Sequence, residues 1–153
     1  MSLFPFSILV CSLVAGADDP QDAKKMIASL QGRWVMVGAE VEGRKAPDKE
    51  YKDGLEVLVI QGTTITYLNN GKEQQKFAFA IDPSKNPALI DLTHDTGDDK
   101  GKTNYAILEL KGDELKLRVN NKFKANAKED RPSKFTTTEG RCAFLVILKR
   151  APK

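Results

Sequence analysis

The segment LQGRWVMVGAEV, residues 30–41, contains the point at which the hydrophobic pattern of this chain changes. Apolar residues before it recur with the helical period of about 3.6, and those after it approach the strand period of 2. Gly32 can take the left-handed conformation that often follows a helix. Trp34, the only tryptophan of the chain, then begins the first long run of strand character. The segment therefore predicts a helix that passes directly into β-structure.

The predicted helix begins near Asp19, which can act as its N-terminal cap, with Pro20 in the first turn. One apolar stripe follows with helical spacing: Ala23, Met26, Ile27 and Leu30. A helix of about three turns is marginally stable alone, so this stripe must pack against something else. We expect it to close one mouth of a barrel.

Beyond residue 33, turn residues recur at intervals of roughly ten, which is typical of an all-β sandwich or barrel. The strand candidates are residues 33–42, 55–61, 64–68, 73–82, 88–93, 103–111, 114–120, 134–138 and 141–150. Short turns such as Asn70-Gly71 favour hairpins between neighbours, and no stretch between strands looks like a crossover helix. We predict an all-β fold: a small antiparallel up-and-down, lipocalin-like barrel of about eight strands with one short N-terminal helix.

The last predicted strand, 141–150, is apolar on both of its faces. It must therefore be covered from outside, and the stripe of the N-terminal helix is the candidate cover. Cys142 falls within this strand, so we expect it to be buried as a small hydrophobic residue.

Length and composition favour one soluble globular domain. The chain has 153 residues, of which 41% are hydrophobic and 29% are charged. Its 24 basic and 21 acidic residues leave a net charge of only +3, spread along the sequence. Nucleic-acid-binding domains usually concentrate their basic residues on one face, so the composition argues against a nucleic-acid partner.

Residues 1–17 carry no charge and end in small residues, with Ala15 and Ala17 placed as in an A-x-A cleavage site. Their apolar run is too short to cross a bilayer, so it predicts a secretory signal peptide; an uncleaved anchor and a buried helix are the alternatives. We expect one domain, residues 18–153, exported to the periplasm or secreted, without a membrane span after cleavage.

Four groups of motifs, in order along the chain, carry a family resemblance: residues 30–34 with 40–43, 81–92, 112–117, and 131–135 with 148–150. They resemble a family of exported, lipocalin-like domains of uncharacterised function found in planctomycetes. The Gly32-x-Trp34 motif is similar to the lipocalin pattern, in which a tryptophan closes one end of an eight-stranded barrel and an arginine packs across it. The resemblance implies that Trp34 and Arg150 form this barrel-closing pair. A guanidinium over an indole contributes about 0.5–2 kcal/mol.

No motif predicts catalysis, a cofactor or a metal. The strongest polar cluster, residues 91–101, contains His94 and four aspartates, but it fails the EF-hand template and is interpreted as a solvated hairpin loop. His94 is expected on this polar loop, whereas Cys142 is expected within an apolar strand. The sequence therefore does not predict that Cys142 and His94 form a pair of nucleophile and general base. We therefore expect a protein that is not an enzyme.

Two functions are compatible with these features. An eight-stranded barrel encloses room for side chains or for one small ligand, so the first is the binding of a small apolar ligand. The aromatic candidates for the lumen wall are Tyr67, Phe77, Phe79, Tyr105 and Phe144. The second is an interaction module with a filled barrel, which would contact a cell-envelope protein or polymer through the loop 120–133 and its Phe123.

Overall fold

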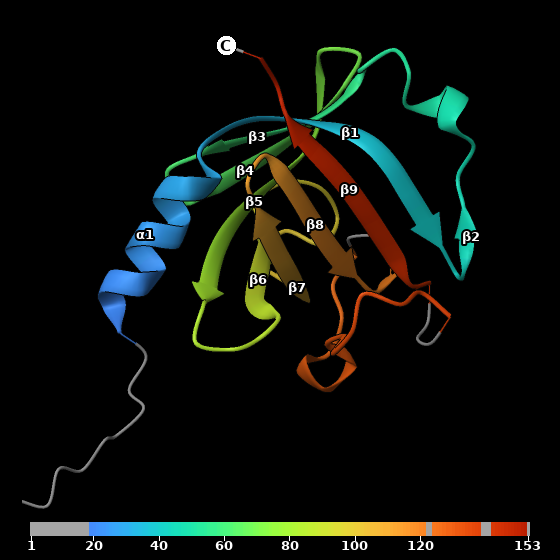
Figure 1. Ribbon diagram of the computed structural model, residues 1–153. Coiled ribbons are helices and arrows are strands. Elements are labelled where there is room, and N and C mark those ends of the chain that lie inside the picture. The colour runs from blue at the N-terminus through green and yellow to red at the C-terminus, as the bar shows by residue number, and fades with distance from the viewer. Residues whose placement is uncertain (1–18, 122–123, 139–141, 153) are drawn as a thin grey trace, which may run out of the picture.

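The computed structural model describes residues 19–121, 124–138 and 142–152 (Figure 1). The predicted signal peptide, residues 1–17, and Phe123 of the predicted interaction loop lie outside the described residues. Within the described part of the chain, no helix has the length and apolar character needed to cross a membrane.

Helix α1 (Pro20–Leu30) begins where the sequence predicts. A side-chain oxygen of Asp19 accepts a hydrogen bond of 2.9 Å from the backbone N–H of Gln21, which caps the first turn. The chain leaves the helix through Gly32, whose φ of +116° is open to glycine and costly for other residues. Helix and first strand are thus joined with almost no connecting loop.

Nine antiparallel strands form one sheet in the spatial order β2-β1-β3-β4-β5-β6-β7-β8-β9, and β1 also pairs with β9. The strands are β1 (Gly32–Val41), β2 (Arg44–Lys45), β3 (Glu56–Gln61), β4 (Thr64–Asn69), β5 (Lys72–Asp82), β6 (Ala88–His94), β7 (Thr103–Lys111), β8 (Glu114–Val119) and β9 (Phe144–Arg150). Among the fully described elements, the single-turn 3₁₀ helices η1 (Asp48–Glu50) and η3 (Lys128–Asp130) lie in connections. Apart from the short β2, eight strands close into the predicted up-and-down barrel, with β1 and β9 side by side in Figure 1.

A β-bulge in β1 lets the strand present buried side chains to the barrel interior on both sides of the bulge. Trp34 and Met36 are buried, and the register with β9 then shifts between Met36 and Gly38. After the shift, Ala39 is the buried residue. One extra residue in a strand reverses the side-chain alternation locally, so the strand bends without losing its inward face.

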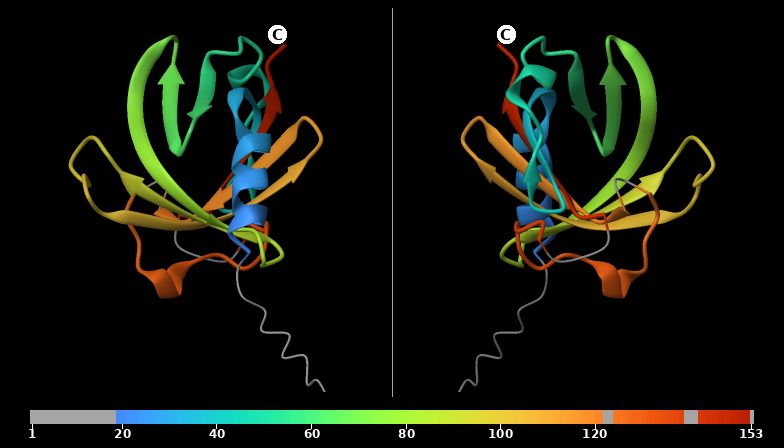
Figure 2. Two further views of the ribbon diagram at one scale, coloured as in Figure 1. Left: turned by 90° about the vertical axis from the view of Figure 1, so that its left-hand side faces the viewer. Right: turned by 90° about the vertical axis from the view of Figure 1, so that its right-hand side faces the viewer.

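Helix α1 lies across one end of the barrel, and the left view of Figure 2 shows it in front of the strands. Its Met26, Ile27 and Leu30 pack against the interior hydrophobic cluster, so this stripe closes one mouth as the sequence predicts. The prediction that the same stripe covers the outer face of the last strand is wrong, because the stripe is already engaged with the interior.

Segment 134–138 covers the last strand instead. The backbone oxygen of Thr136 accepts a 2.8 Å hydrogen bond from Arg118 Nε on β8, and the Thr137 hydroxyl donates to Glu40 on β1. Arg118 and Glu40 are both register partners of Leu145 on β9, so the segment crosses the outside of these three strands.

Two predictions fail in this region. Segment 134–138 is not a strand, because closure of β1 on β9 leaves no barrel edge with which it could pair. Cys142 is not buried: it is exposed, has a φ of +47°, and precedes β9 rather than lying within it. The predicted strand, 141–150, therefore begins three residues before Phe144, the first residue of β9, because the apolar run gave no sign of this turn; residue 141 itself lies outside the described residues.

Trp34 and Arg150 are register partners at the junction of β1 with β9. The guanidinium carbon of Arg150 lies 4.2 Å from the centre of the fully buried Trp34 ring. The indole Nε1 donates a 2.8 Å hydrogen bond to the carbonyl of Leu30, the last residue of α1. This is the geometry that the family resemblance implies for the pair.

The same guanidinium also binds the end of helix α1. Arg150 Nη1 and Nη2 donate hydrogen bonds of 2.8 Å to the carbonyls of Gln31 and Ser29. Its Nε donates to Asp113 Oδ1 at 3.0 Å, in the turn between β7 and β8. A cation at a helix C-terminus satisfies carbonyls that have no partner within the helix. One side chain therefore joins helix, first strand, last strand and a turn.

Replacing Arg150 with alanine should lower the free energy of unfolding by at least about 1 kcal/mol, because the substitution removes a cation–π contact and leaves helix carbonyls unpaired. Chemical denaturation followed by Trp34 fluorescence measures the change. Lys149→Ala is the matched control, since Lys149 is the exposed neighbour on the same strand and such changes usually stay within about 0.5 kcal/mol. Equal stabilities of the two variants would contradict the prediction.

Candidate functional site

The barrel interior contains a cavity of about 80 Å³. Ten side chains line it: Met36, Glu56, Leu58, Ile65, Tyr67, Gln75, Phe77, Leu92, Leu117 and Phe144. They come from β1, β3, β4, β5, β6, β8 and β9, so nearly every wall of the barrel contributes. The lining is predominantly apolar, and its polar members are confined to three neighbouring strands.

Three of the five predicted lumen aromatics line this cavity: Tyr67, Phe77 and Phe144. Phe79 also faces inward, but it is buried in the hydrophobic cluster away from the cavity lining. Tyr105 was expected to face inward as well, and this is wrong. On β7 the inward residues of the cluster are Ala106 and its alternate neighbours, which places Tyr105 on the outer face.

Most of the interior is filled by side chains. One buried water molecule needs roughly 10–15 Å³ of free space, so the cavity of about 80 Å³ has room for only a few waters. Typical drug-sized pockets are several times larger. The lumen of the barrel is therefore neither fully open nor fully filled. It has space for a compact molecule or for one short apolar chain.

The polar members of the lining are contiguous. Tyr67 on β4 is the register partner of both Leu58 on β3 and Gln75 on β5, and Glu56 lies two residues before Leu58 on the same face. Same-face neighbours on adjacent strands are close enough for their side chains to interact. Glu56, Tyr67 and Gln75 thus form one polar group on an otherwise apolar wall, each of them only half-buried.

Burial raises the pKa of Glu56 above its ordinary value, although the Tyr67 hydroxyl acts in the opposite direction by hydrogen bonding to it. Glu50 in η1 raises the same pKa further through its like charge. The pKa of Tyr67 is also raised, again mainly by burial. A desolvated carboxyl on an apolar wall is the kind of group that selects ligands by charge.

His94 is a second interior polar residue, and the sequence placed it wrongly. It is not on a solvated loop: it ends β6, is only 2% exposed, and its ring lies 4.8 Å from that of Phe77 in an edge-to-face arrangement. Its Nε2 and the Oδ1 of Asn104 are buried and have no hydrogen-bond partner among the described residues. Burial lowers the pKa of His94, outweighing the nearby charge of Asp99.

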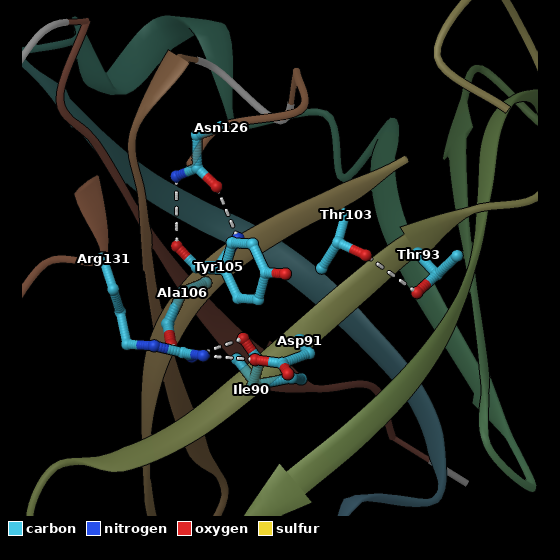
Figure 3. Close-up of polar contacts among 8 residues, drawn as sticks. All are labelled: Ile90, Asp91, Thr93, Thr103, Tyr105, Ala106, Asn126 and Arg131. Atoms are coloured by element: carbon cyan, nitrogen blue, oxygen red, sulfur yellow. Dashed lines mark hydrogen bonds and ion pairs between the residues drawn. The ribbon is translucent and has the colours of Figure 1, made fainter. Parts of the chain in front are cut away.

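The outer face at β6 and β7 is held by Arg131 (Figure 3). Arg131 Nη1 donates to the carbonyls of Ile90 and Ala106 at 3.2 and 2.9 Å, and Nη2 lies 2.5 Å from Asp91 Oδ1. Its guanidinium also lies over the Tyr105 ring, 5.1 Å from the ring centre. Arg131 therefore attaches the segment between β8 and β9 to the barrel and is not a free basic residue for a partner.

Asn126 makes a second attachment of this segment. Its side chain accepts a 2.7 Å hydrogen bond from the backbone N–H of Tyr105 and donates to the carbonyl of the same residue at 3.2 Å (Figure 3). In the acidic loop before β7, Lys102 Nζ bonds Asp99 at 3.1 Å, and this contact lowers the pKa of Asp99. Among the described residues, no three His, Cys, Asp or Glu side chains gather closely enough to hold a metal ion.

The interior polar residues that are not predicted from the sequence include Glu56, Gln75 and His94. The period-2 pattern contained the information in each case. His94 continues the alternation Ala88, Ile90, Leu92, and Gln75 precedes Phe77 and Phe79 with the same spacing. Polarity at the ends of strands was interpreted as exposure, whereas the barrel wall extends to these ends.

The pH dependence of stability should reveal the burial of His94. A histidine whose folded pKa lies below its unfolded value of about 6.5 binds protons preferentially in the unfolded state. Its contribution to stability is therefore complete above this value and is lost as the pH falls through it toward the folded pKa. Between pH 7.5 and pH 5.0 the parent protein should lose stability that His94→Leu does not lose, up to about 2 kcal/mol.

Urea denaturation at a series of pH values measures this difference. His94 is the only histidine of the chain, so the two proteins differ in no other group that titrates near pH 6. Parallel pH profiles for parent and variant would show that His94 is protonated equally well in the folded state.

Comparison with known proteins assigns no family to the chain. No family model, curated protein or solved structure matches it. The fold described above rests on strand pairing and burial alone, and the family resemblance of the motifs stays a prediction.

Proposed function

We propose that this protein binds a small, largely apolar ligand inside its barrel and that its role is binding rather than catalysis. The observation that carries this proposal is the apolar cavity of about 80 Å³ between Phe77, Leu117 and Phe144. Unfilled apolar space in a protein interior has a cost in stability, and a ligand that fills it recovers the missing contacts.

The size of the cavity sets the affinity to be expected. Transfer of each CH₂ group from water to an apolar site contributes about 0.8 kcal/mol, so a chain of about five carbons gains roughly 4 kcal/mol. This corresponds to a dissociation constant on the order of 1 mM. Tighter binding requires polar contacts as well, and Glu56, Tyr67 and Gln75 are the lining residues that can provide them.

The setting of this activity is part of the proposal. The uncharged segment 1–17, with its A-x-A ending, supports export of the mature domain to the periplasm or the medium. The order and spacing of the motifs support membership of the exported lipocalin-like family named above. Export and family membership are both argued from the sequence. N-terminal sequencing of the protein recovered from its native host tests whether the signal peptide is removed.

An interaction module is the alternative function. Lys124, Lys128 and Lys134 are exposed on the segment between β8 and β9, so an acidic envelope protein or polymer could bind there. The observations favour the interior, because Arg131 and Asn126 serve to attach this segment to the barrel.

Pentan-1-ol should bind the parent protein with a dissociation constant on the order of 1 mM, as judged from heteronuclear NMR shifts. Leu117→Phe should weaken this binding about tenfold or more, because the larger side chain occupies the cavity. Leu55→Phe is the matched control, since Leu55 is 45% exposed and the same substitution leaves the cavity unchanged.

Thermal unfolding of both variants shows whether each is folded. If Leu117→Phe is too unstable, Leu117→Val supplies the opposite test: it enlarges the cavity and should strengthen the binding of pentan-1-ol. Shifts from pentan-1-ol that are absent in the parent, or that persist unchanged in both Leu117 variants, would contradict binding in the barrel.

A further inference from the structure

Glu56 occupies an unusual place for a carboxylate. It begins β3 with its side chain directed into the barrel, where it lines the apolar cavity together with Leu58 and Phe77. Among the side chains that the structure describes, no Lys or Arg forms an ion pair with it. A charge on a wall of this kind loses hydration, and the described side chains offer it the Tyr67 hydroxyl but no counter-charge.

The described groups that surround Glu56 do not neutralise it. Tyr67 on β4 and Tyr51 after η1 are uncharged at neutral pH, and Glu50 in η1 carries a like charge that disfavours ionisation of Glu56. A bound cation would relieve both the desolvation and the repulsion. Burial and Glu50 already raise the pKa of Glu56, as expected for a carboxyl that lacks a counter-charge.

The neighbours of Glu56 define what sort of cation fits. Its carboxylate, the Tyr67 hydroxyl and the Gln75 carboxamide provide oxygen acceptors on three adjacent strands, β3, β4 and β5. A primary ammonium group has three N–H donors and can address several acceptors at once. The apolar remainder of the lining then suits an alkyl chain attached to that nitrogen.

We propose that the ligand is a primary amine with a short apolar chain, whose ammonium group binds Glu56 with Tyr67 and Gln75 while the chain enters the cavity. This inference rests on the proposed function, because it assigns the ligand class of the same cavity. Divalent metal ions are a poorer fit, since they prefer several carboxylate or imidazole ligands and this wall supplies one carboxylate.

Three probes of equal chain length separate the contributions of cavity and charge. Pentan-1-ol reports the cavity alone, pentylamine adds the ammonium group, and pentanoate adds a charge of the opposite sign. At pH 7.5, heteronuclear NMR titration of the parent protein should show pentylamine binding about tenfold more tightly than pentan-1-ol, and pentanoate more weakly than both.

Glu56→Gln should remove the preference for pentylamine over pentan-1-ol, so that the two probes bind this variant with similar affinity. Glu73→Gln is the matched control: it makes the same change of charge at an exposed position on β5, and the amine preference should persist. Thermal unfolding of both variants shows whether each is folded.

A pH series on the parent protein provides a test that needs no variant. Pentylamine stays protonated throughout, so its preference should disappear as the pH falls and Glu56 becomes neutral, beginning above the ordinary carboxyl pKa of 4.5. The binding of pentan-1-ol should not follow this change.

The outcomes distinguish this inference from the proposed function. Equal binding of amine and alcohol, or an amine preference that survives Glu56→Gln, would overturn the amine inference and leave the apolar cavity site standing. Failure of all three probes to bind would overturn both. A preference that depends on Glu56 supports both.

Discussion

Closure of the barrel depends on the pairing of β1 with β9, and the contact of Arg150 with Trp34 lies at this junction. Without that pairing, two long strands would present unpaired N–H and C=O groups as free edges. The guanidinium stacks on the indole and at the same time binds the carbonyls that end α1. A single cation therefore joins the end of the helix to the strand junction that closes the sheet.

This arrangement divides the interior into two regions. Near Trp34 the interior is occupied by the helix stripe and by large apolar side chains. Farther along the barrel, the lining changes in character, with the cavity beside Phe77 and the polar residues Glu56 and Gln75 on its wall. The cavity is thus lined partly by residues of the hydrophobic core and partly by polar groups that packing alone would not favour.

The fold could be predicted from alternation and turn spacing, because these follow from backbone geometry that every strand shares. The side to which a residue points was less predictable, because it depends on register. Tyr105 was assigned inward for its aromatic character, although its neighbour Ala106 holds the inward position. Segment 134–138 has the threonines of a strand, and nothing local to it indicates that a closed barrel offers no edge to pair with.

The candidate site was partly visible for the same reason. Phe77 and Phe144 are apolar and alternate with other apolar residues, so the sequence pointed to them directly. Predicting that Glu56 and His94 are interior requires a different inference. A polar residue has to be assigned to the interior because its strand neighbours at i±2 are buried. Charge at a strand end is usually solvated, and only the three-dimensional path of the wall shows that these two are not.

The junction of β1 with β9 also has a kinetic consequence. Every other pairing in the barrel joins strands that follow one another along the chain, apart from the brief excursion through β2, whereas this one joins the two ends of the domain. Closing a long loop costs more chain entropy than closing a hairpin, and such contacts slow folding. Completion of the barrel is therefore the step with the largest entropic barrier, and the single tryptophan lies where that step takes place.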